Sequence, residues 1–349
     1  MTDDRPWALR TTYLAIQQSF TGFCPLPVSP ALRLHSVRLE ATMLTGSQVD
    51  ISMQTIQESR IPQAAPPRSN QLYHHFTVDV EEYFQVSALE AHVPRSAWDS
   101  IESRIDVGMD RLLGLLESHD ARGTFFVLGW LAERRPDIVR RIVEQGHELA
   151  SHGWDHARVT TIRPEEFRES VRRSKAALER IGGVEITGFR APSFSIVPGL
   201  EWALNILVEE GYTYDSSLFP VARRGYGYPR GGRDPYWIEC ASGTLIEVPP
   251  ATLRRFGVNL PAAGGGYLRM LPLGLTRAAV VAAERRNAPA TLYIHPWELD
   301  PEQPRLNVPL ITKIRHYSGL EQTEERLDRL LREYTYRPIA YTIGQMAHP

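Results

Sequence analysis

The sequence contains little cysteine and no long uncharged apolar run. Cys24 and Cys240 are the only two cysteines among 349 residues. Two distant cysteines exclude a disulfide framework and a zinc finger built from cysteines, and they are typical of a reducing compartment. The nearest approach to a membrane span, residues 271–283, is interrupted by Arg277. The sequence therefore predicts no transmembrane helix.

The chain also has a net charge close to zero, and it lacks the serine-hydrolase and dinucleotide-binding motifs. Its 39 Lys and Arg residues nearly balance 41 Asp and Glu residues, for a formal net charge of −2, so electrostatics give no reason to expect nucleic-acid binding. No G-x-S-x-G follows a predicted strand, which argues against a serine hydrolase. Gly264-Gly-Gly266 lacks the spacing of a dinucleotide-binding loop, and we interpret it as a flexible lid or a turn.

The first seventy residues differ from the rest of the chain. They show no sustained helical or strand periodicity and end in the polar, proline-containing stretch 61–70. Such a segment buries too little apolar surface to offset its ordering entropy. Residues 1–70 are therefore expected to be a disordered extension, or in part an over-long reading of the gene, because Met43 and Met53 offer later starts. Residues 10–19 are too polar for a signal peptide.

From residue 71 to residue 349, short β-rich runs alternate with helical patterns, which predicts a single catalytic domain. Alternation of this kind indicates an α/β fold with a parallel sheet, and about seven repeats favour closure into a distorted (β/α)7-type barrel. The expected strands are 73–80, 124–128, 148–151, 187–190, 212–215, 245–248, 291–295 and 339–343. The expected helices are 107–118, 137–145, 165–181, 200–210, 273–286 and 323–334.

Ionisable side chains gather at the predicted strand ends. In a (β/α) barrel these ends form one face, and that face carries the active site. A shared position on five strands is difficult to explain by structural needs alone. The residues concerned are Asp79, Glu81, Glu82, His152, His156, Arg190, Asp215 and His295.

Two short segments among them predict a metal site. In Ser151-His-Gly-Trp-Asp-His156, the histidines at i and i+4 can face the same way if the segment turns into a helix. In Thr77-Val-Asp-Val-Glu-Glu82, Asp79 and Glu81 lie on one face of a strand. Two histidines and one carboxylate are a common catalytic zinc set with an open position for water. A chance histidine pair and a solvated acidic loop are the alternatives.

These motifs resemble the polysaccharide deacetylases of the NodB-homology type, carbohydrate esterase family four. The similarity extends over about residues 72–345, and it is closer to the exopolysaccharide-locus deacetylases associated with bacterial exosortase (PEP-CTERM) systems. The motifs that carry it are Val78-Asp-Val-Glu-Glu-Tyr-Phe-Gln-Val86, Gly123-Thr-Phe-Phe-Val127, Ser151-His-Gly-Trp-Asp-His156, Gly188-Phe-Arg-Ala-Pro-Ser-Phe194, Tyr214-Asp-Ser-Ser-Leu218, Gly264-Gly-Gly-Tyr-Leu-Arg269, His295-Pro-Trp-Glu298 and Gln303-Pro-Arg305.

The resemblance implies a role for each strand-end residue. Asp79 would be the general base and His295 the general acid, with His152 and His156 as metal ligands. Arg190 would hold the base by a charge-assisted hydrogen bond, although a plain strand-end salt bridge is the alternative. Asp215 would orient the acid histidine.

Departures from the family pattern leave some assignments open. Val80 stands where the family has its metal-binding aspartate, so we assign the carboxylate ligand to Glu81 and keep Glu82 in reserve. Ser193, which replaces a tyrosine, would offer its backbone N–H to the oxyanion. Tyr293 replaces a leucine of the acetate pocket.

Three further expectations concern the site's ligands. Tyr83 and Trp297 are candidates to stack on sugar rings, although core packing explains an isolated aromatic at least as often. The cofactor is expected to be a divalent metal, Zn²⁺ before Co²⁺, Ni²⁺ or Mn²⁺.

The implied activity is hydrolysis of the N-acetyl groups of N-acetylhexosamine units in a bacterial exopolysaccharide or its precursor. Metal-activated water would attack the amide. The alternatives are a related C–N hydrolase for a ureide or cyclic imide, and a barrel that only binds glycan. The expected partners are the N-acetylated glycan and the exopolysaccharide-synthesis machinery, and the expected location is the cytoplasm.

Overall fold

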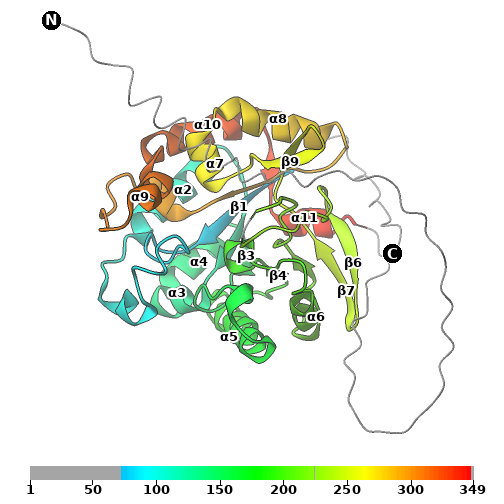
Figure 1. The fold of residues 1–349 in the computed structure, drawn as a ribbon, viewed down its shortest axis with the longest axis horizontal. Helices are drawn as coiled ribbons and strands as arrows, with labels where there is room; N and C mark the ends of the chain where they lie inside the picture. Colours follow the sequence, from blue (N-terminus) through cyan, green and yellow to red (C-terminus); the bar gives the residue numbers. More distant parts are fainter. Residues whose placement is uncertain (1–71, 224, 347–349) are drawn as a thin grey trace, which may run out of the picture. The chain divides into compact units, whose positions relative to one another are not determined.

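A computed structural model describes residues 72–223 and 225–346 of the chain (Figure 1). The expected disordered extension, 1–70, lies outside the described residues. The described residues belong to one compact unit, Ser59–Pro349. None of their helices has the length and apolar character needed to cross a membrane.

The core of the unit is a mixed nine-stranded sheet in the order β10-β1-β2-β3-β4-β5-β7-β6, with β11 paired to β1. Its neighbours are parallel except for β6, which runs antiparallel to β7. A separate antiparallel hairpin is formed by β8 and β9. The strands are β1 (His74–Val80), β2 (Thr124–Val127), β3 (Glu148–Ser151), β4 (Gly188–Phe189), β5 (Tyr214–Asp215), β6 (Tyr236–Cys240), β7 (Gly243–Glu247), β8 (Thr252–Arg255), β9 (Val258–Pro261), β10 (Thr291–Ile294) and β11 (Tyr336–Arg337).

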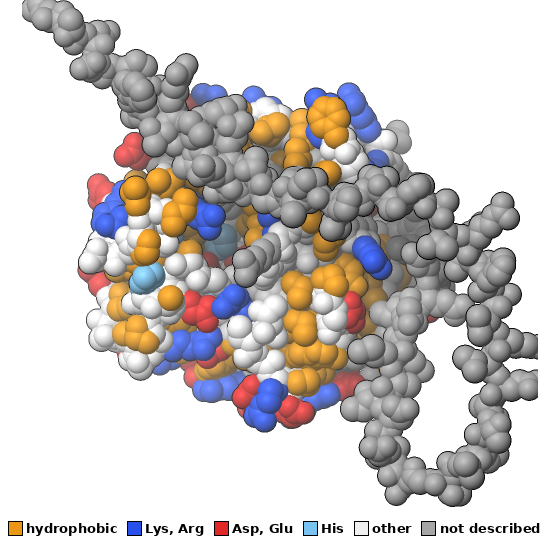
Figure 2. All heavy atoms as spheres, in the orientation of Figure 1, with side chains coloured by type: hydrophobic (Ala, Val, Ile, Leu, Met, Phe, Trp, Pro, Cys, Tyr) orange, Lys and Arg blue, Asp and Glu red, His pale blue; other side chains and the backbone are white. Residues whose placement is uncertain are grey.

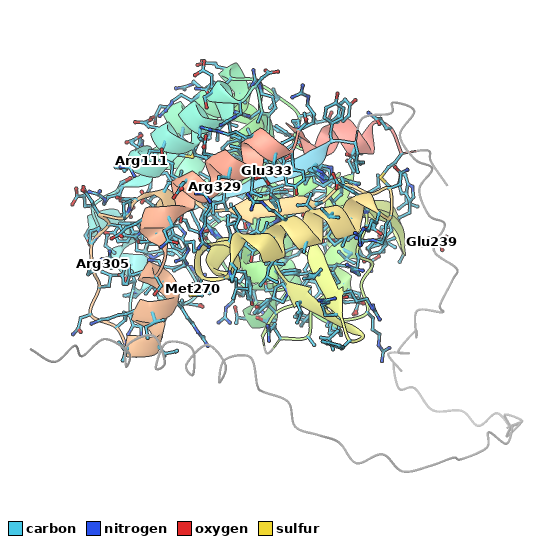
Figure 3. All side chains as sticks on the ribbon, turned by 90° about the horizontal axis from the view of Figure 1, so that it is seen from above. Arg111, Glu239, Met270, Arg305, Arg329 and Glu333 are labelled. Atoms are coloured by element: carbon cyan, nitrogen blue, oxygen red, sulfur yellow. The ribbon has the colours of Figure 1, made fainter. Side chains whose placement is uncertain are left out.

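Helices cover the outside of the sheet (Figure 1). They are α2 (Ile105–Ser118), α3 (Gly129–Arg134), α4 (Pro136–Glu144), α5 (Pro164–Gly182), α6 (Trp202–Glu209), α7 (Gly265–Met270), α8 (Leu273–Glu284), α9 (Leu310–Tyr317), α10 (Thr323–Glu333) and α11 (Ile339–Ile343). Short 3₁₀ turns add η1 (Arg95–Ser100), η2 (Val159–Thr161), η3 (Pro192–Phe194), η4 (Pro296–Leu299) and η5 (Leu320–Gln322). Viewed from above, α8 and α10 lie side by side, and Arg277 Nε donates to Glu333 Oε2 at 2.7 Å between them (Figure 3).

The sheet curves into the predicted distorted barrel. All seven residues of β1 are buried, because helices and neighbouring strands cover both of its faces. The two ends of the sheet approach each other through the segment that follows β7. The N–H of Ala251 in that segment donates to Thr291 O of β10 at 3.0 Å, and Tyr293 N–H donates to Ala263 O at 3.0 Å. These contacts join the ends of the sheet without a continuous ladder.

The predicted strand 339–343 is wrong, because these residues form helix α11. The β-branched run favours a strand locally, but Pro338 ends the short β11 and precedes the first turn of a helix. The N–H groups of Ile339 and Ala340 donate to Thr124 Oγ1 at 2.8 Å and Glu148 Oε2 at 3.0 Å. Thr124 and Glu148 begin β2 and β3, so α11 closes the amino-terminal end of the barrel. The carboxyl ends of the strands are left for the site.

Candidate metal and catalytic site

Three ligand-type side chains meet at the carboxyl ends of β1 and β3. One ligand atom each from Glu81, His152 and His156 lies within 4.8 Å of the others, and all three residues are buried. The histidines come together through a loop and not through the helix considered from their spacing. Gly153 and His156 adopt left-handed backbone angles, with φ of 74° and 57°. That bend brings the two imidazole ring centroids to 5.5 Å.

The protonation states of these groups suit a cation. His152 Nδ1 lies 2.8 Å from Arg190 O, and a carbonyl only accepts, so Nδ1 carries the proton and Nε2 offers its lone pair. Burial lowers the pKa of His152 to about 4, which keeps the ring neutral at pH 7. Burial opposes ionisation of Glu81, but the charges of His156 and His295 outweigh it and lower its pKa to about 2.

One oxygen of Glu81 lacks an aligned partner. His156 Nε2 lies 2.8 Å from Glu81 Oε2, yet among the described residues this buried oxygen accepts no well-oriented hydrogen bond. The other oxygen, Oε1, accepts from Trp297 Nε1 at 3.2 Å. A buried, unsatisfied carboxylate oxygen beside two imidazole nitrogens fits a divalent metal of the zinc type.

Glu82, held in reserve as a ligand, lies outside this cluster. Its side chain accepts hydrogen bonds from Ser103 Oγ and, at 3.1 Å, from Arg104 N–H. Ser103 and Arg104 stand directly before α2, so Glu82 satisfies a backbone N–H at the start of that helix. The structure therefore places Glu81, and not Glu82, with the histidines.

Asp79 is buried two residues before Glu81 and is held by Arg190. Arg190 Nη1 donates to Asp79 Oδ1 and to Thr77 Oγ1, both at 2.7 Å. Arg190 Nη2 donates to Ser216 Oγ at 2.8 Å, and the guanidinium lies 4.1 Å from the centre of the Phe126 ring. Arg190 is fully buried. The aspartate is thus fixed by a charge-assisted bond, which leaves Oδ2 turned to the site.

His295 follows β10 and faces the two carboxylates. Its Nε2 lies 3.9 Å from Asp79 Oδ2 and 3.7 Å from Glu81 Oε1. With 17% of its side chain exposed, it is more accessible than Asp79 or Glu81. Figure 2 shows a hollow near the end of β1 with histidine atoms on its floor.

Glu298, which sequence reasoning did not assign to the site, orients this histidine. His295 Nδ1 donates to Glu298 Oε1 at 2.5 Å, and Arg269 Nε donates to Glu298 Oε2 at 2.5 Å. Burial opposes charging of His295, but the hydrogen bond and charge of Glu298 prevail and raise its pKa to about 9. The sequence contained a signal for this contact, because Glu298 stands three residues after His295 in the same motif. In the structure both residues face one side of the 3₁₀ turn η4.

Arg269 is fixed as firmly as its carboxylate partner. It is 3% exposed, and its guanidinium also donates to the carbonyl oxygens of Arg315, His316 and Ser318. These carbonyls belong to the end of α9 and the residue after it. The hydrogen bonds that hold Glu298 and Arg269 beside His295 therefore all come from residues in the C-terminal part of the chain.

Asp215, expected to orient His295, lies elsewhere in the structure. Ser217 donates to it through Oγ at 2.5 Å and N–H at 3.2 Å. Its register partner across β5 and β7 is Glu247. Asp215 ends β5 inside the barrel wall, so its position at a strand end did not bring it to His295.

We predict that Glu298→Gln lowers kcat for the reaction of this site about ten- to a hundredfold, because a hydrogen bond to a charged group is lost. Asp215→Asn should lower kcat less. The check is kcat, KM and metal content for both variants at the same pH. A larger loss in Asp215→Asn would restore the role expected from the sequence.

The buried pair of Asp215 and Glu247 predicts a pH-dependent stability. Burial raises the pKa of Asp215 to about 6, and burial together with Asp215 raises that of Glu247 well above its usual range. The folded pair holds protons that the unfolded chain releases, so its contribution to stability falls as pH rises from about 4 through 6. In urea denaturation, Asp215→Asn should lose less stability than the parent chain between about pH 4 and about pH 7. An equal loss would refute this.

The three residues expected to bind substrate have different surroundings. Tyr83 is buried and packs edge-on against Phe84, so it is a core residue and not a sugar platform. Trp297 is also buried, between His295 and His316, and donates to Glu81. Ser193 has a left-handed backbone, with φ of 55°, and its Oγ lies 2.6 Å from Ser87 Oγ. Backbone strain of this kind gathers at functional sites.

Gly264 and Gly265 are not a flexible lid but part of the packing around Tyr293. A side chain at Gly264 would bring its Cβ to 2.0 Å from Tyr293 O. Gly265, with φ of 51°, begins α7 against the tyrosine ring. Tyr293 also packs edge-on against Phe194, beside Phe219. The glycines therefore make room for a large residue where the family was expected to have leucine.

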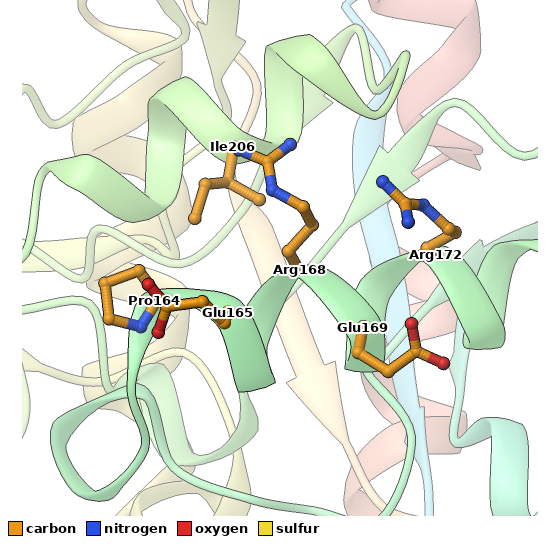
Figure 4. Close-up of a pocket in the computed structure, with 6 residues that line it drawn as sticks. All are labelled: Pro164, Glu165, Arg168, Glu169, Arg172 and Ile206. Atoms are coloured by element: carbon orange, nitrogen blue, oxygen red, sulfur yellow. The ribbon is translucent and has the colours of Figure 1, made fainter.

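A second surface hollow lies away from this site, on α5 and α6 (Figure 4). Pro164, Glu165, Arg168, Glu169, Arg172 and Ile206 line it. Arg168 and Arg172 already pair with Glu210. The hollow contains none of the strand-end residues considered above.

Two family models match parts of this chain. Residues 99–214 match the family model described as polysaccharide deacetylase, and residues 216–343 match a domain of unknown function (DUF3473). Arg269, His295 and Glu298 all lie in the second match.

Two curated relatives are peptidoglycan-N-acetylglucosamine deacetylases. The one from Bacillus cereus is 32% identical over 94 residues, which are 27% of this chain and 34% of the relative. The one from Listeria monocytogenes is 35% identical over 72 residues, 20% of this chain and 16% of the relative. The chain thus spans at most about a third of the length of these relatives.

A solved structure is similar to most of this fold. It comes from Mycobacterium smegmatis, from a protein described as a candidate polysaccharide deacetylase. It has a TM-score of 0.55 and 21% identity, and the match covers 82% of this chain and 94% of that one. The expected α/β fold of the NodB-homology type is confirmed. Residues 99–214 are thus similar to the polysaccharide deacetylase family, and the described chain shares the fold of one of the solved structures described as such a deacetylase.

Proposed function

We propose that this chain is a metal-dependent hydrolase that removes N-acetyl groups from N-acetylhexosamine units of a bacterial polysaccharide. The observation that carries the proposal is the meeting of Glu81, His152 and His156 within 4.8 Å, with Asp79 and His295 beside them. Ligands alone would serve a structural ion. A carboxylate and an imidazole next to the ligands are the base and the acid that hydrolysis of an amide requires.

The chemistry follows from the position of each side chain. A divalent cation held by Glu81, His152 and His156 would polarise the amide carbonyl and make a nearby water more acidic. Asp79, fixed by Arg190, would take a proton from the attacking water. His295 would give the proton on Nε2 to the amine nitrogen as its bond to the acyl carbon breaks, and Glu298 would hold the ring in place and stabilise its charge. The products are acetate and a free amine.

The substrate and surroundings are proposed on less direct grounds. The relatives named above support an N-acetylglucosamine unit. The resemblance to deacetylases of exosortase-associated loci supports an exopolysaccharide and its synthesis machinery as partners, and the nitrogen-rich ligand set supports zinc. The cytoplasmic location stays a prediction. A barrel that only binds glycan would not need a base and an acid beside the ligands, and no observation favours a ureide or cyclic imide.

The test is acetate release from N-acetylglucosamine oligomers by the full-length, metal-loaded protein. Acetate release should stop with a chelator and in Asp79→Asn, and should persist in the matched control Asp99→Asn, which alters an exposed aspartate on η1. Release that is insensitive to the chelator, or equal in Asp79→Asn, would contradict the proposal.

A further inference from the structure

The β8–β9 hairpin has an unusual tip. Residues 255–258 form a two-residue turn in which Phe256 and Gly257 both have positive φ, 50° and 78°. Such turns favour Asn-Gly, and a bulky residue at the first position is strained. Phe256 is also fully exposed, at 101% of its reference area. Neither local geometry nor packing explains a phenylalanine here, so the strain points to a function of the tip.

The outward face of the same hairpin carries three aliphatic side chains and one arginine. Leu253 pairs with Leu260 and Arg255 with Val258 across the two strands, so these four side chains share one face. Val258 and Leu260 are 38% and 39% exposed. The opposite face is anchored: Thr252 and Pro261 are buried, and Asn259 Nδ2 donates to Pro220 O at 2.8 Å.

The charge around the tip is positive. Arg255, on the outward face, and Arg254, on the opposite face, are both exposed, and neither is joined to an acidic side chain in the described part of the chain. Arg233, at the base of the hairpin, donates to Thr252 O at 2.8 Å. Figure 2 shows hydrophobic side chains next to Lys and Arg in the region where Figure 1 places the β8–β9 hairpin.

We infer that the β8–β9 hairpin docks this protein on a bilayer surface that carries anionic lipid headgroups. An exposed aromatic ring and aliphatic side chains enter the interface, while neighbouring arginines bind the headgroups. A flat lipid surface needs no pocket, which matches the convex shape of a hairpin tip.

Two other occupants fit less well. A glycan is bound by a concave surface with donors and acceptors, but the exposed polar side chains at the tip are two arginines, which cannot accept. A second copy docked tip to tip would bring Arg254 and Arg255 against the same residues of its partner, and like charges would repel.

The hairpin is also tied to the candidate site. Thr276 Oγ1 of α8 donates to Ala262 O, directly after β9, at 2.7 Å. The next residue, Ala263, pairs with Tyr293, which stands two residues before His295. A membrane bound by the hairpin is therefore linked, through the backbone hydrogen bond between Tyr293 and Ala263, to the strand that precedes His295.

The test is co-sedimentation of the full-length protein with vesicles of phosphatidylcholine, with and without phosphatidylserine. The protein should bind the phosphatidylserine vesicles more tightly, and added salt should weaken binding. Phe256→Asn should lower the affinity about tenfold without loss of thermal stability, because asparagine tolerates positive φ. Replacement of Arg254 and Arg255 by glutamine should cost about fivefold for each charge.

The matched control is Leu310→Asn, which removes another exposed apolar side chain, on α9, 72% exposed. It should bind vesicles like the parent chain, and all variants should release acetate from soluble oligomers at the parent rate. No vesicle binding, or equal binding by Phe256→Asn and the parent, would overturn the inference. The inference would also be overturned if the hairpin variants changed only the oligomeric state of the protein or its retention of polysaccharide, and not its binding to vesicles.

Discussion

Replacement of His295 by alanine should lower kcat for acetate release by about 10²–10⁴-fold, the range for loss of a positioned proton donor. His295 is the ring that faces both Asp79 and Glu81 without being held within the ligand cluster. Metal content, measured by mass spectrometry, should therefore stay at the parent level. Loss of the metal together with activity would show that His295 is a ligand and not the acid.

The matched control is His147→Gln, a substitution of another buried histidine. His147 Nδ1 accepts the N–H of Gly123 at 3.2 Å, just before β2 and β3, at the amino-terminal end of the barrel. A glutamine oxygen can accept the same bond. This variant should keep kcat within about threefold of the parent, because the substitution does not touch the reacting groups.

Replacement of Arg190 by methionine should destabilise the protein by about 3–5 kcal/mol, the range for removal of one partner of a buried ion pair. Asp79 would stay buried without its partner, and the hydroxyls of Thr77 and Ser216 would lose a donor. Urea denaturation with a chelator present measures this stability without a contribution from bound metal.

The double variant Asp79→Asn, Arg190→Met separates pairing from packing. Because it removes both charges, it should be more stable than Arg190→Met alone. A different result is that the double variant loses as much stability, relative to the parent, as the two single variants together. Arg190 would then stabilise the protein through packing on Phe126, and the buried ion pair would not be what holds Asp79.

The sequence predicted which side chains approach one another where those side chains follow the carboxyl ends of parallel strands. Parallel strands bring their carboxyl ends to one edge, so the approach of Asp79, Glu81, His152, His156 and His295 could be expected from local patterns alone. The order of the main strands and helices followed from the same alternation. The contact between Arg190 and Asp79 was also expected, although only through the family resemblance.

The errors arose where tertiary contacts override local pattern. Residues 339–343 read as a strand, but hydrogen bonds to the starts of β2 and β3 favour the helix α11. The hairpin β8–β9 has no alternation that distinguishes it from a loop. Asp215 stands at a strand end yet turns to Glu247, and Glu298 reaches His295 because η4 folds back within three residues. Tyr83 and Trp297 were candidates for sugar stacking, and core packing, the alternative, could not be decided because burial cannot be read from a motif.

The central claim is that Glu81, His152 and His156 hold the metal on which deacetylation depends. The most direct measurement is titration of metal-free, full-length protein with Zn²⁺ while acetate release from N-acetylglucosamine oligomers is followed. The account predicts that activity rises in proportion to added metal and saturates at about one ion per chain, the number that a single three-ligand site holds. Acetate release at the full rate before metal is added, or binding of the ion without any gain in activity, would contradict it.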